Sequence, residues 1–382
     1  MQRRAFVQLV GGGVVGAALA GCSPAMPPEA VAAWQGPGSE PDLRRWLLGH
    51  AILAPHSHNL QSWLVDLRTP GEIVLRCDRT RLLPETDPFG RQILMSHGTF
   101  LELLDLAARE RGQRAEITLF PEGEFGPDRI DDRPVARVLL RADAGVARDP
   151  LFAQILHRRT NRNAYDAARP VPDIAWQALS AAVQQDGLQF GHTAAADPQL
   201  QAHRDIANEA WRIEMVTPRA MLETFRVLRV GADEIARHRD GLSLTDPLVV
   251  ALARLGLFDR SQAPAPDSRV TRQQIDDFRR KIASTPAFLW LLSRGNGRAA
   301  QVAAGRAYAR VQLAATAQGL ALHPLQQALQ EYPEQRSTYA AIHQLLQAPP
   351  ATHTVQMWAR VGHAEAVGPA PRRGVDALLV KA

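Results

Sequence analysis

The spacing of apolar and polar residues along the chain predicts a mixed α+β fold. Apolar residues recur at helical spacing over 42–54 and over 91–111, and the second of these helices stops at Gly112. Alternating positions predict strands at 63–68 and 72–77. Further strands are expected at 116–120, 135–141 and 355–360, and further helices at 150–157, 174–183 and 298–318.

The pattern starts again after about residue 150, which predicts two halves, 42–150 and 151–382. A chain of 382 residues is long enough for two modest domains, each with a core. The stretch 198–295 is mainly helical and has no counterpart in the first half. We therefore expect it to be an insertion that covers a site.

Residues 1–21 are typical of a leader. Arg3-Arg4, a phenylalanine two positions later and an apolar run of about thirteen residues resemble a twin-arginine export signal. The run is too short to span a bilayer of about 30 Å comfortably as a helix. Leu19-Ala20-Gly21-Cys22 resembles a lipoprotein processing box, so we expect lipidation at Cys22 and a tether over 22–41. The alternative is a plain N-terminal anchor helix.

This leader predicts an exported, periplasmic protein anchored to a membrane by its lipid. Ser23, which follows the lipid cysteine, does not decide between the inner and the outer membrane. The twin-arginine route carries proteins that are already folded, often around a cofactor made in the cytoplasm.

Charge and cysteine content exclude two classes of protein. The net charge is +5, or +3 without Arg3 and Arg4, and no basic stripe is interleaved with aromatic residues. A nucleic-acid partner is therefore not expected. Cys22 and Cys77 are the two cysteines, so the chain has no internal disulfide framework. We expect Cys77 to be a small core residue, and the alternative is a reactive thiol.

One candidate site is the basic segment after His157. Arg158, Arg159 and Arg162 lie within five residues, with the hydroxyl of Thr160 between them. Guanidinium groups bind phosphate oxygens in pairs, so this segment suits a phosphate. The alternative is a surface cluster paired with acids such as Asp166.

The segment 56–61 offers imidazole and amide groups on a turn just before a strand. Its side chains include His58, Asn59 and Gln61, and an amide can both donate to and accept from the polar edge of a flat heteroaromatic ring. A metal site would need carboxylate or cysteine ligands, and none has a supporting spacing. A helix-ending turn is the structural alternative.

A third candidate is the loop 322–327, which contains Gln326 and Gln327. A rigid loop that directs backbone N–H groups at a ring nitrogen would assist hydride acceptance there. A plain connection between helices is the alternative. Arg372 and Arg373 form a late basic pair that does not decide the matter alone.

The order of these motifs resembles the nitroreductase family, in particular an exported branch with two nitroreductase-like halves in one chain. The family has an Arg-Arg-Ser-x-Arg motif and an Ala-Pro-Ser-x-x-Asn-x-Gln-Pro-Trp turn; here the turn lies in the first half and the arginine motif opens the second. Thr160 stands where Ser is usual, and His56 and Ser62 also depart from the pattern.

The resemblance implies a nitroreductase-like fold, a pseudo-dimer in one chain and flavin mononucleotide (FMN) as cofactor. Its residues would be ring contacts His58, Asn59 and Gln61, phosphate and ribityl contacts Arg158, Arg159, Thr160 and Arg162, reactive-nitrogen loop residues Gln326 and Gln327, and late phosphate contacts Arg372 and Arg373.

The expected function is an FMN-dependent oxidoreductase that passes hydride or electrons from a small-molecule donor to nitroaromatic or quinone-like acceptors. The alternatives are a protein that binds or sequesters FMN without turnover, and a lipoprotein that has lost the flavin and serves as an interaction module. No side chain is indicated as a catalytic acid, and no metal is expected. Nicotinamide donors are cytoplasmic, so an exported chain calls for another donor. One complete site in one chain predicts a monomer.

Overall fold

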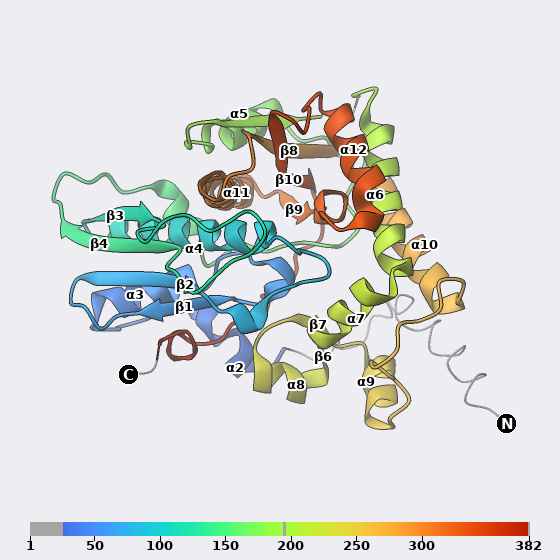
Figure 1. The fold of residues 1–382 in the computed structure, drawn as a ribbon, viewed down its shortest axis with the longest axis horizontal. Coiled ribbons are helices and arrows are strands. Elements are labelled where there is room, and N and C mark those ends of the chain that lie inside the picture. The colour runs from blue at the N-terminus through green and yellow to red at the C-terminus, as the bar shows by residue number, and fades with distance from the viewer. Residues whose placement is uncertain (1–25, 194–195, 381–382) are drawn as a thin grey trace.

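The computed structural model describes residues 26–193 and 196–380, which form an α+β fold built from two halves (Figure 1). The first half contains α3 (Leu43–Ala51), β1 (Trp63–Asp66), β2 (Glu72–Cys77), α4 (Arg91–Glu110), β3 (Gln113–Leu119) and β4 (Ala136–Ala142). The second contains α5 (Asp173–Ala181), β5 (Leu188–His192), β8 (Ala287–Arg294), α11 (Arg298–Ala317), β9 (Ala321–Pro324), α12 (Arg336–Leu345) and β10 (His353–Gly362).

The two halves have the same topology. Each runs helix, strand, strand, long helix, strand, strand, with α12 added between the last two strands of the second half and the insertion between its first two, and each forms a four-stranded sheet. The sheet orders are β1-β2-β4-β3 and β5-β8-β10-β9, so in both the last strand lies beside the second. All of these strand pairs are antiparallel. The α+β class and the fused-halves arrangement predicted from the sequence are confirmed.

The long helices α4 and α11 hold the halves together, and the two sheets lie on opposite sides of this pair (Figure 1). The helices approach so closely that a Cβ on Gly98 would lie 2.0 Å from the Val302 carbonyl oxygen, and one on Gly305 would lie 1.8 Å from that of Met95. Buried Glu102 on α4 pairs with Arg306 and Arg310 on α11, at 2.7 and 2.9 Å. Only glycine permits this contact, and the ion pairs set its alignment.

The helical insertion lies between β5 and β8 of the second half, where the first half has a five-residue turn. It contains α6 (Leu200–Val216), α7 (Pro218–Arg226), β6 (Leu228–Val230), α8 (Gly231–His238), β7 (Leu242–Leu244), α9 (Pro247–Arg254) and α10 (Arg269–Ala283). The predicted end at residue 295 is wrong, because Ala287–Arg294 is a strand of the second sheet.

Both terminal segments pack on the first half. Residues 28–35, predicted as part of a tether, form α2 (Pro28–Val31) and the 3₁₀ turn Ala32–Gln35, which buries Trp34. The C-terminal tail returns from the second half to the edge of β1, where the Val65 N–H donates to the Leu378 carbonyl oxygen at 2.8 Å. The predicted leader and Cys22 lie outside the described residues. Within 26–193 and 196–380, no helix is long and apolar enough to cross a membrane.

Short 3₁₀ turns replace two elements that the sequence pattern predicts differently. The predicted helix 150–157 is the turn Pro150–Gln154, and the loop 322–327 is a strand end followed by the turn Gln326–Leu329. The other short turns are Ser57–Asn59, Arg79–Arg81, Pro333–Gln335 and Val375–Ala377.

Candidate anion site at the junction of the halves

The turn before β1 has an unusual backbone. His58, Asn59 and Gln61 all have left-handed φ angles, of 48°, 55° and 54°. Residues with side chains rarely adopt this conformation, and such strained positions gather at binding and catalytic sites. The segment that the sequence marks as a ring-binding turn is therefore held in a conformation that its surroundings must enforce.

The amides of this turn bond to the helical insertion and to the C-terminal tail. Asn59 Nδ2 donates to the carbonyl oxygens of Pro371 and Gly241, at 3.1 and 3.3 Å, and its Oδ1 accepts from Arg372. Gln61 is 0% exposed, and its Nε2 donates to the Arg239 carbonyl oxygen at 2.9 Å. Whether these amides contact a flavin ring stays a prediction, because both side chains bond here to protein.

Arg158 and Arg372 lie side by side beneath this turn. Each is at most 3% exposed, and each donates to the carbonyl oxygen of Leu53, at 3.0 and 3.3 Å. Burial lowers the pKa of Arg158 to about 10, and burial, with added repulsion from Arg158 and Arg159, lowers the pKa of Arg372 well below its ordinary value. Two motifs more than two hundred residues apart in the sequence thus converge.

No carboxylate within the described residues forms an ion pair with the basic cluster of Arg158, Arg159, Arg162, Arg372 and Arg373. The Nε atoms of Arg158, Arg372 and Arg373 are buried without a hydrogen-bond partner. An uncompensated buried charge costs several kcal/mol, on the order of 3–5 when a partner is missing. Such a cluster is what an anionic ligand would complete.

Arg298 shows the contrast. It is also buried without a carboxylate within ion-pair distance, but its three nitrogens donate to the carbonyl oxygens of Phe89, Gly126 and Pro127. A lone arginine satisfied by backbone is a structural feature, whereas a group of arginines with unused N–H groups is a candidate binding site.

Helix α11 supplies two polar residues that the sequence analysis did not single out for this site. Gln312 accepts from Arg158 at 3.1 Å and donates to the Arg159 carbonyl oxygen at 3.3 Å, and its Nε2 lies 3.4 Å from the Thr160 hydroxyl. Tyr308, one turn earlier, has a buried hydroxyl without a partner and lies close enough to Arg158 and Arg162 to be affected by their charge. Their four-residue spacing on a helix is the signal that could have indicated a shared face.

Arg162 extends the basic cluster toward the second half. Its side chain is exposed and makes no hydrogen bond within the described residues, yet desolvation by the surrounding protein lowers its pKa. A side chain that lines a recess accounts for both observations. His58 lies near it, and burial together with Arg162 lowers the His58 pKa to about 4, so that its imidazole is neutral at pH 7.

Strand β9, which follows α11, reaches the same region through His323. Its Nδ1 accepts from Arg360 Nε at 3.0 Å, and burial, followed by the charges of Arg360 and Arg162, lowers its pKa well below the ordinary value. Gln326 has a buried Oε1 without a partner, whereas Gln327 is directed toward Glu214 of the helical insertion. Gln326 Nε2 donates to the Gln356 carbonyl oxygen at 3.3 Å, and a flavin contact of Gln326 or Gln327 stays a prediction.

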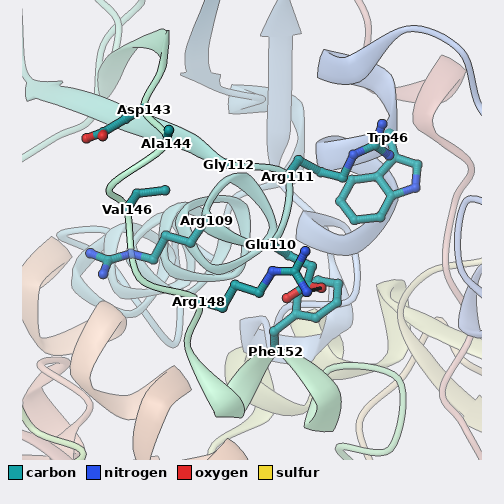
Figure 2. A pocket seen from close by; sticks show the side chains of 10 residues that line it. All are labelled: Trp46, Arg109, Glu110, Arg111, Gly112, Asp143, Ala144, Val146, Arg148 and Phe152. Carbon is teal, nitrogen blue, oxygen red and sulfur yellow. Dashed lines mark ion pairs between the residues drawn. The ribbon is translucent and has the colours of Figure 1, made fainter.

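A separate cavity of about 660 Å³ lies in the first half (Figure 2). It is lined by Trp46, Arg109, Glu110, Arg111, Gly112, Asp143, Ala144, Val146, Arg148 and Phe152. None of these residues belongs to the basic cluster or to the strained turn. Among the described residues, no group of His, Cys, Asp and Glu side chains is arranged to hold a metal ion.

Comparison with known proteins finds relatives that match nearly the whole chain. No family model matches. A provisionally named NAD(P)H nitroreductase of Mycobacterium tuberculosis strain H37Rv is 28% identical over 352 residues, which cover 88% of this chain and 90% of the relative. Its counterpart in strain CDC 1551 / Oshkosh matches equally. These relatives support the nitroreductase family.

Solved structures give weaker matches. The FMN-dependent nitroreductase of Mycobacterium smegmatis in complex with NADPH is 19% identical, covers 60% of this chain and 96% of its own, and has a TM-score of 0.37. A nitroreductase from Desulfovibrio desulfuricans in complex with FMN is 15% identical, covers 62% and 98%, and has a TM-score of 0.33.

Proposed function

We propose that this chain is an FMN-dependent oxidoreductase of nitroreductase type. The observation that carries the proposal is the basic cluster at the junction of the halves, which includes buried arginines without carboxylate partners. A flavin phosphate brings up to two negative charges and oxygen atoms that match paired guanidinium N–H groups. The unused Nε atoms of Arg158 and Arg372 fit that ligand.

The remaining residues of the site have roles that follow from their chemistry. Arg162, His58 and His323 lie beyond the phosphate end, where neutral imidazoles can donate to or accept from the ring edge. Tyr308 has a free buried hydroxyl that can bond to a ribityl or phosphate oxygen. When bound, the flavin supplies the hydride or electron transfer, and the protein supplies position and electrostatics.

The test is the flavin content of the purified chain and of two variants. We expect Arg158→Ala combined with Arg372→Ala to lose bound FMN, because the phosphate would lose two buried charge partners, each worth about 1.5–3 kcal/mol as a charged hydrogen bond. Arg298→Ala is the matched control, since it removes a buried arginine elsewhere and should retain FMN. Flavin absorbance and the mass of the released ligand measure the FMN content. Full FMN occupancy in the double variant would refute the proposed site.

A specific observation favours the alternative of FMN binding without turnover. The helical insertion bonds directly to the strained turn, since the backbone of Arg239 and Gly241 meets Gln61 and Asn59. An insertion fixed there restricts access to a ring bound at the turn. Steady-state reduction of a nitroaromatic or a quinone by the flavin-loaded chain distinguishes the two: turnover supports the oxidoreductase, and a tightly held flavin without turnover supports sequestration.

The location and the donor are proposals that rest on the sequence alone. The twin arginines and Cys22 support export and lipid anchoring on the periplasmic side. Metabolic labelling with a fatty acid, compared between the wild type and Cys22→Ser, tests the anchor, and the absence of label on the wild type would refute it. The relatives' name points to a nicotinamide donor, which an exported chain would not meet, so donor preference is to be measured with both nicotinamide and quinol donors.

A further inference from the structure

The segment just after the predicted leader contacts the phosphate side of the candidate site through one aromatic residue. Trp34 is 7% exposed and lies in the 3₁₀ turn Ala32–Gln35. Its indole Nε1 donates to the Ala370 carbonyl oxygen at 2.8 Å, which ties the turn to the C-terminal tail. The ring is therefore fixed in place rather than carried on a free tether.

Three arginines of the basic cluster pack on this one ring. The guanidinium carbons of Arg159, Arg372 and Arg158 lie 4.3, 5.1 and 5.3 Å from the ring centroid of Trp34. An aromatic face attracts a cation within about 6 Å of the ring centroid, more strongly where water is excluded. A ring thus collects the guanidinium groups without neutralising them, and the Nε–H groups of Arg158 and Arg372 remain without a hydrogen-bond partner.

The same segment contacts the other parts that surround the site. The Arg372 backbone N–H donates to the Ala30 carbonyl oxygen at 2.8 Å, and α2 contacts α8 of the helical insertion. Residues 28–35 therefore join the arginine loop, the C-terminal tail and the insertion. If residues 28–35 were displaced, the arginine loop, the C-terminal tail and the insertion would each lose contacts that form one side of the site.

The repeated topology of the halves relates this segment to the arginine motif. The arginine motif precedes α5, the first helix of the second half, and the turn with Trp34 precedes α3, the first helix of the first half. The two segments thus hold equivalent positions in the two halves. In this chain one carries the arginines and the other carries the ring on which they pack.

We propose that Trp34 is a positioning residue of the cofactor site and that residues 28–35 complete its phosphate side. This inference rests on the proposed FMN site. FMN binding and the packing of residues 28–35 involve the same arginines. Bound FMN should therefore order the segment, and an ordered segment should strengthen FMN binding by the same factor.

The experiment measures the dissociation constants of FMN and riboflavin for the flavin-free full-length chain by quenching of flavin fluorescence. Trp34→Ala is expected to weaken FMN binding about tenfold or more, and riboflavin binding by less than threefold, because riboflavin has no phosphate. Trp34→Phe keeps a ring for the arginines and should stay within threefold of the wild type for both ligands. Trp46→Ala is the control, since it removes a ring that packs with Arg111 at 4.7 Å in the separate cavity.

Two results would overturn the inference. One is equal FMN affinity of Trp34→Ala and the wild type; the other is an equal loss for FMN and riboflavin, which would indicate a folding defect. Amide hydrogen exchange of residues 28–35 in the wild type does not depend on the folding of a variant. Bound FMN should slow this exchange, and an unchanged exchange rate would also overturn the inference. A wild-type chain that binds neither flavin would instead refute the proposed function.

Discussion

At the scale of single residues, the site combines positions that the sequence indicates with positions that only the fold brings together. Arg158 and the turn around Asn59 are local motifs that side-chain chemistry alone marks as candidates. Trp34 and Gln312 both contact Arg158, which is more than a hundred residues away from each of them in the sequence. No local pattern distinguishes Trp34 from an ordinary core residue, and only the four-residue spacing from Tyr308 could have indicated Gln312.

Glu214 gives a prediction at this scale. It is 3% exposed in α6 and accepts from Gln330 at 2.9 Å, and burial, with the nearby charge of Glu223, raises its pKa to about 7. A carboxyl group whose pKa is raised on folding binds its proton more tightly in the folded state. The free energy of unfolding therefore falls as the pH rises from about 4.5 to about 7, by on the order of 3 kcal/mol.

We expect Glu214→Gln to remove this dependence, because its amide oxygen can still accept from Gln330 and carries no charge. Denaturant unfolding should show the variant more stable than the wild type at pH 8 and similar to it at pH 5. Glu209→Gln, an exposed residue on the same helix that pairs with Arg212, is the control and should change stability by less than about 1 kcal/mol. A wild-type stability that is level between pH 5 and pH 8 would contradict the raised pKa.

At the scale of elements, prediction succeeded where apolar residues recur with a clear period along the sequence. β2 occupies the predicted residues 72–77, and α4 begins at the predicted Arg91 and ends one residue short of the predicted end. β8 was missed because it is buried on both faces and reads as a continuous apolar run inside a helical stretch. The four residues of β9 are too few to show a period.

The contact between α4 and α11 gives the prediction for this scale. Gly305→Ala places a methyl group where the Met95 carbonyl oxygen lies, so the helices must separate. We expect the free energy of unfolding to fall by about 3 kcal/mol or more, since forced separation adds lost packing to overpacking strain. FMN affinity should fall as well, because α11 carries Gln312 and Tyr308.

Gly368→Ala is the control for this change, because a Cβ there meets no atom within 4 Å. Thermal and denaturant unfolding of both variants give the comparison. If Gly305→Ala is as stable as Gly368→Ala, the helices do not pack as closely in solution as they do here.

At the scale of the whole molecule, the chain contains two halves of the same topology, and only the second half has the insertion. The positions equivalent to the candidate site differ between the halves. The repeated topology makes the two halves comparable position by position. The arginine motif before α5 has its equivalent in residues 28–41 before α3, which contain no Lys or Arg. The turn before β1 has its equivalent in residues 182–187 before β5, which contain glutamines but no asparagine.

This asymmetry predicts one FMN per chain and a chain that acts as a monomer. The second junction has neither the basic residues for a phosphate nor the complete amide turn, so a second flavin would have no charge partner there. The helical insertion also belongs to one half only, and it lies against the one turn that carries Asn59 and Gln61. Native mass spectrometry of the flavin-loaded chain should give a monomer with one FMN, unchanged when FMN is added in excess. Two flavins per chain would show that the duplicated fold has kept two sites. A dimer that loses its flavin on dilution into monomers would show that a second chain completes the site described.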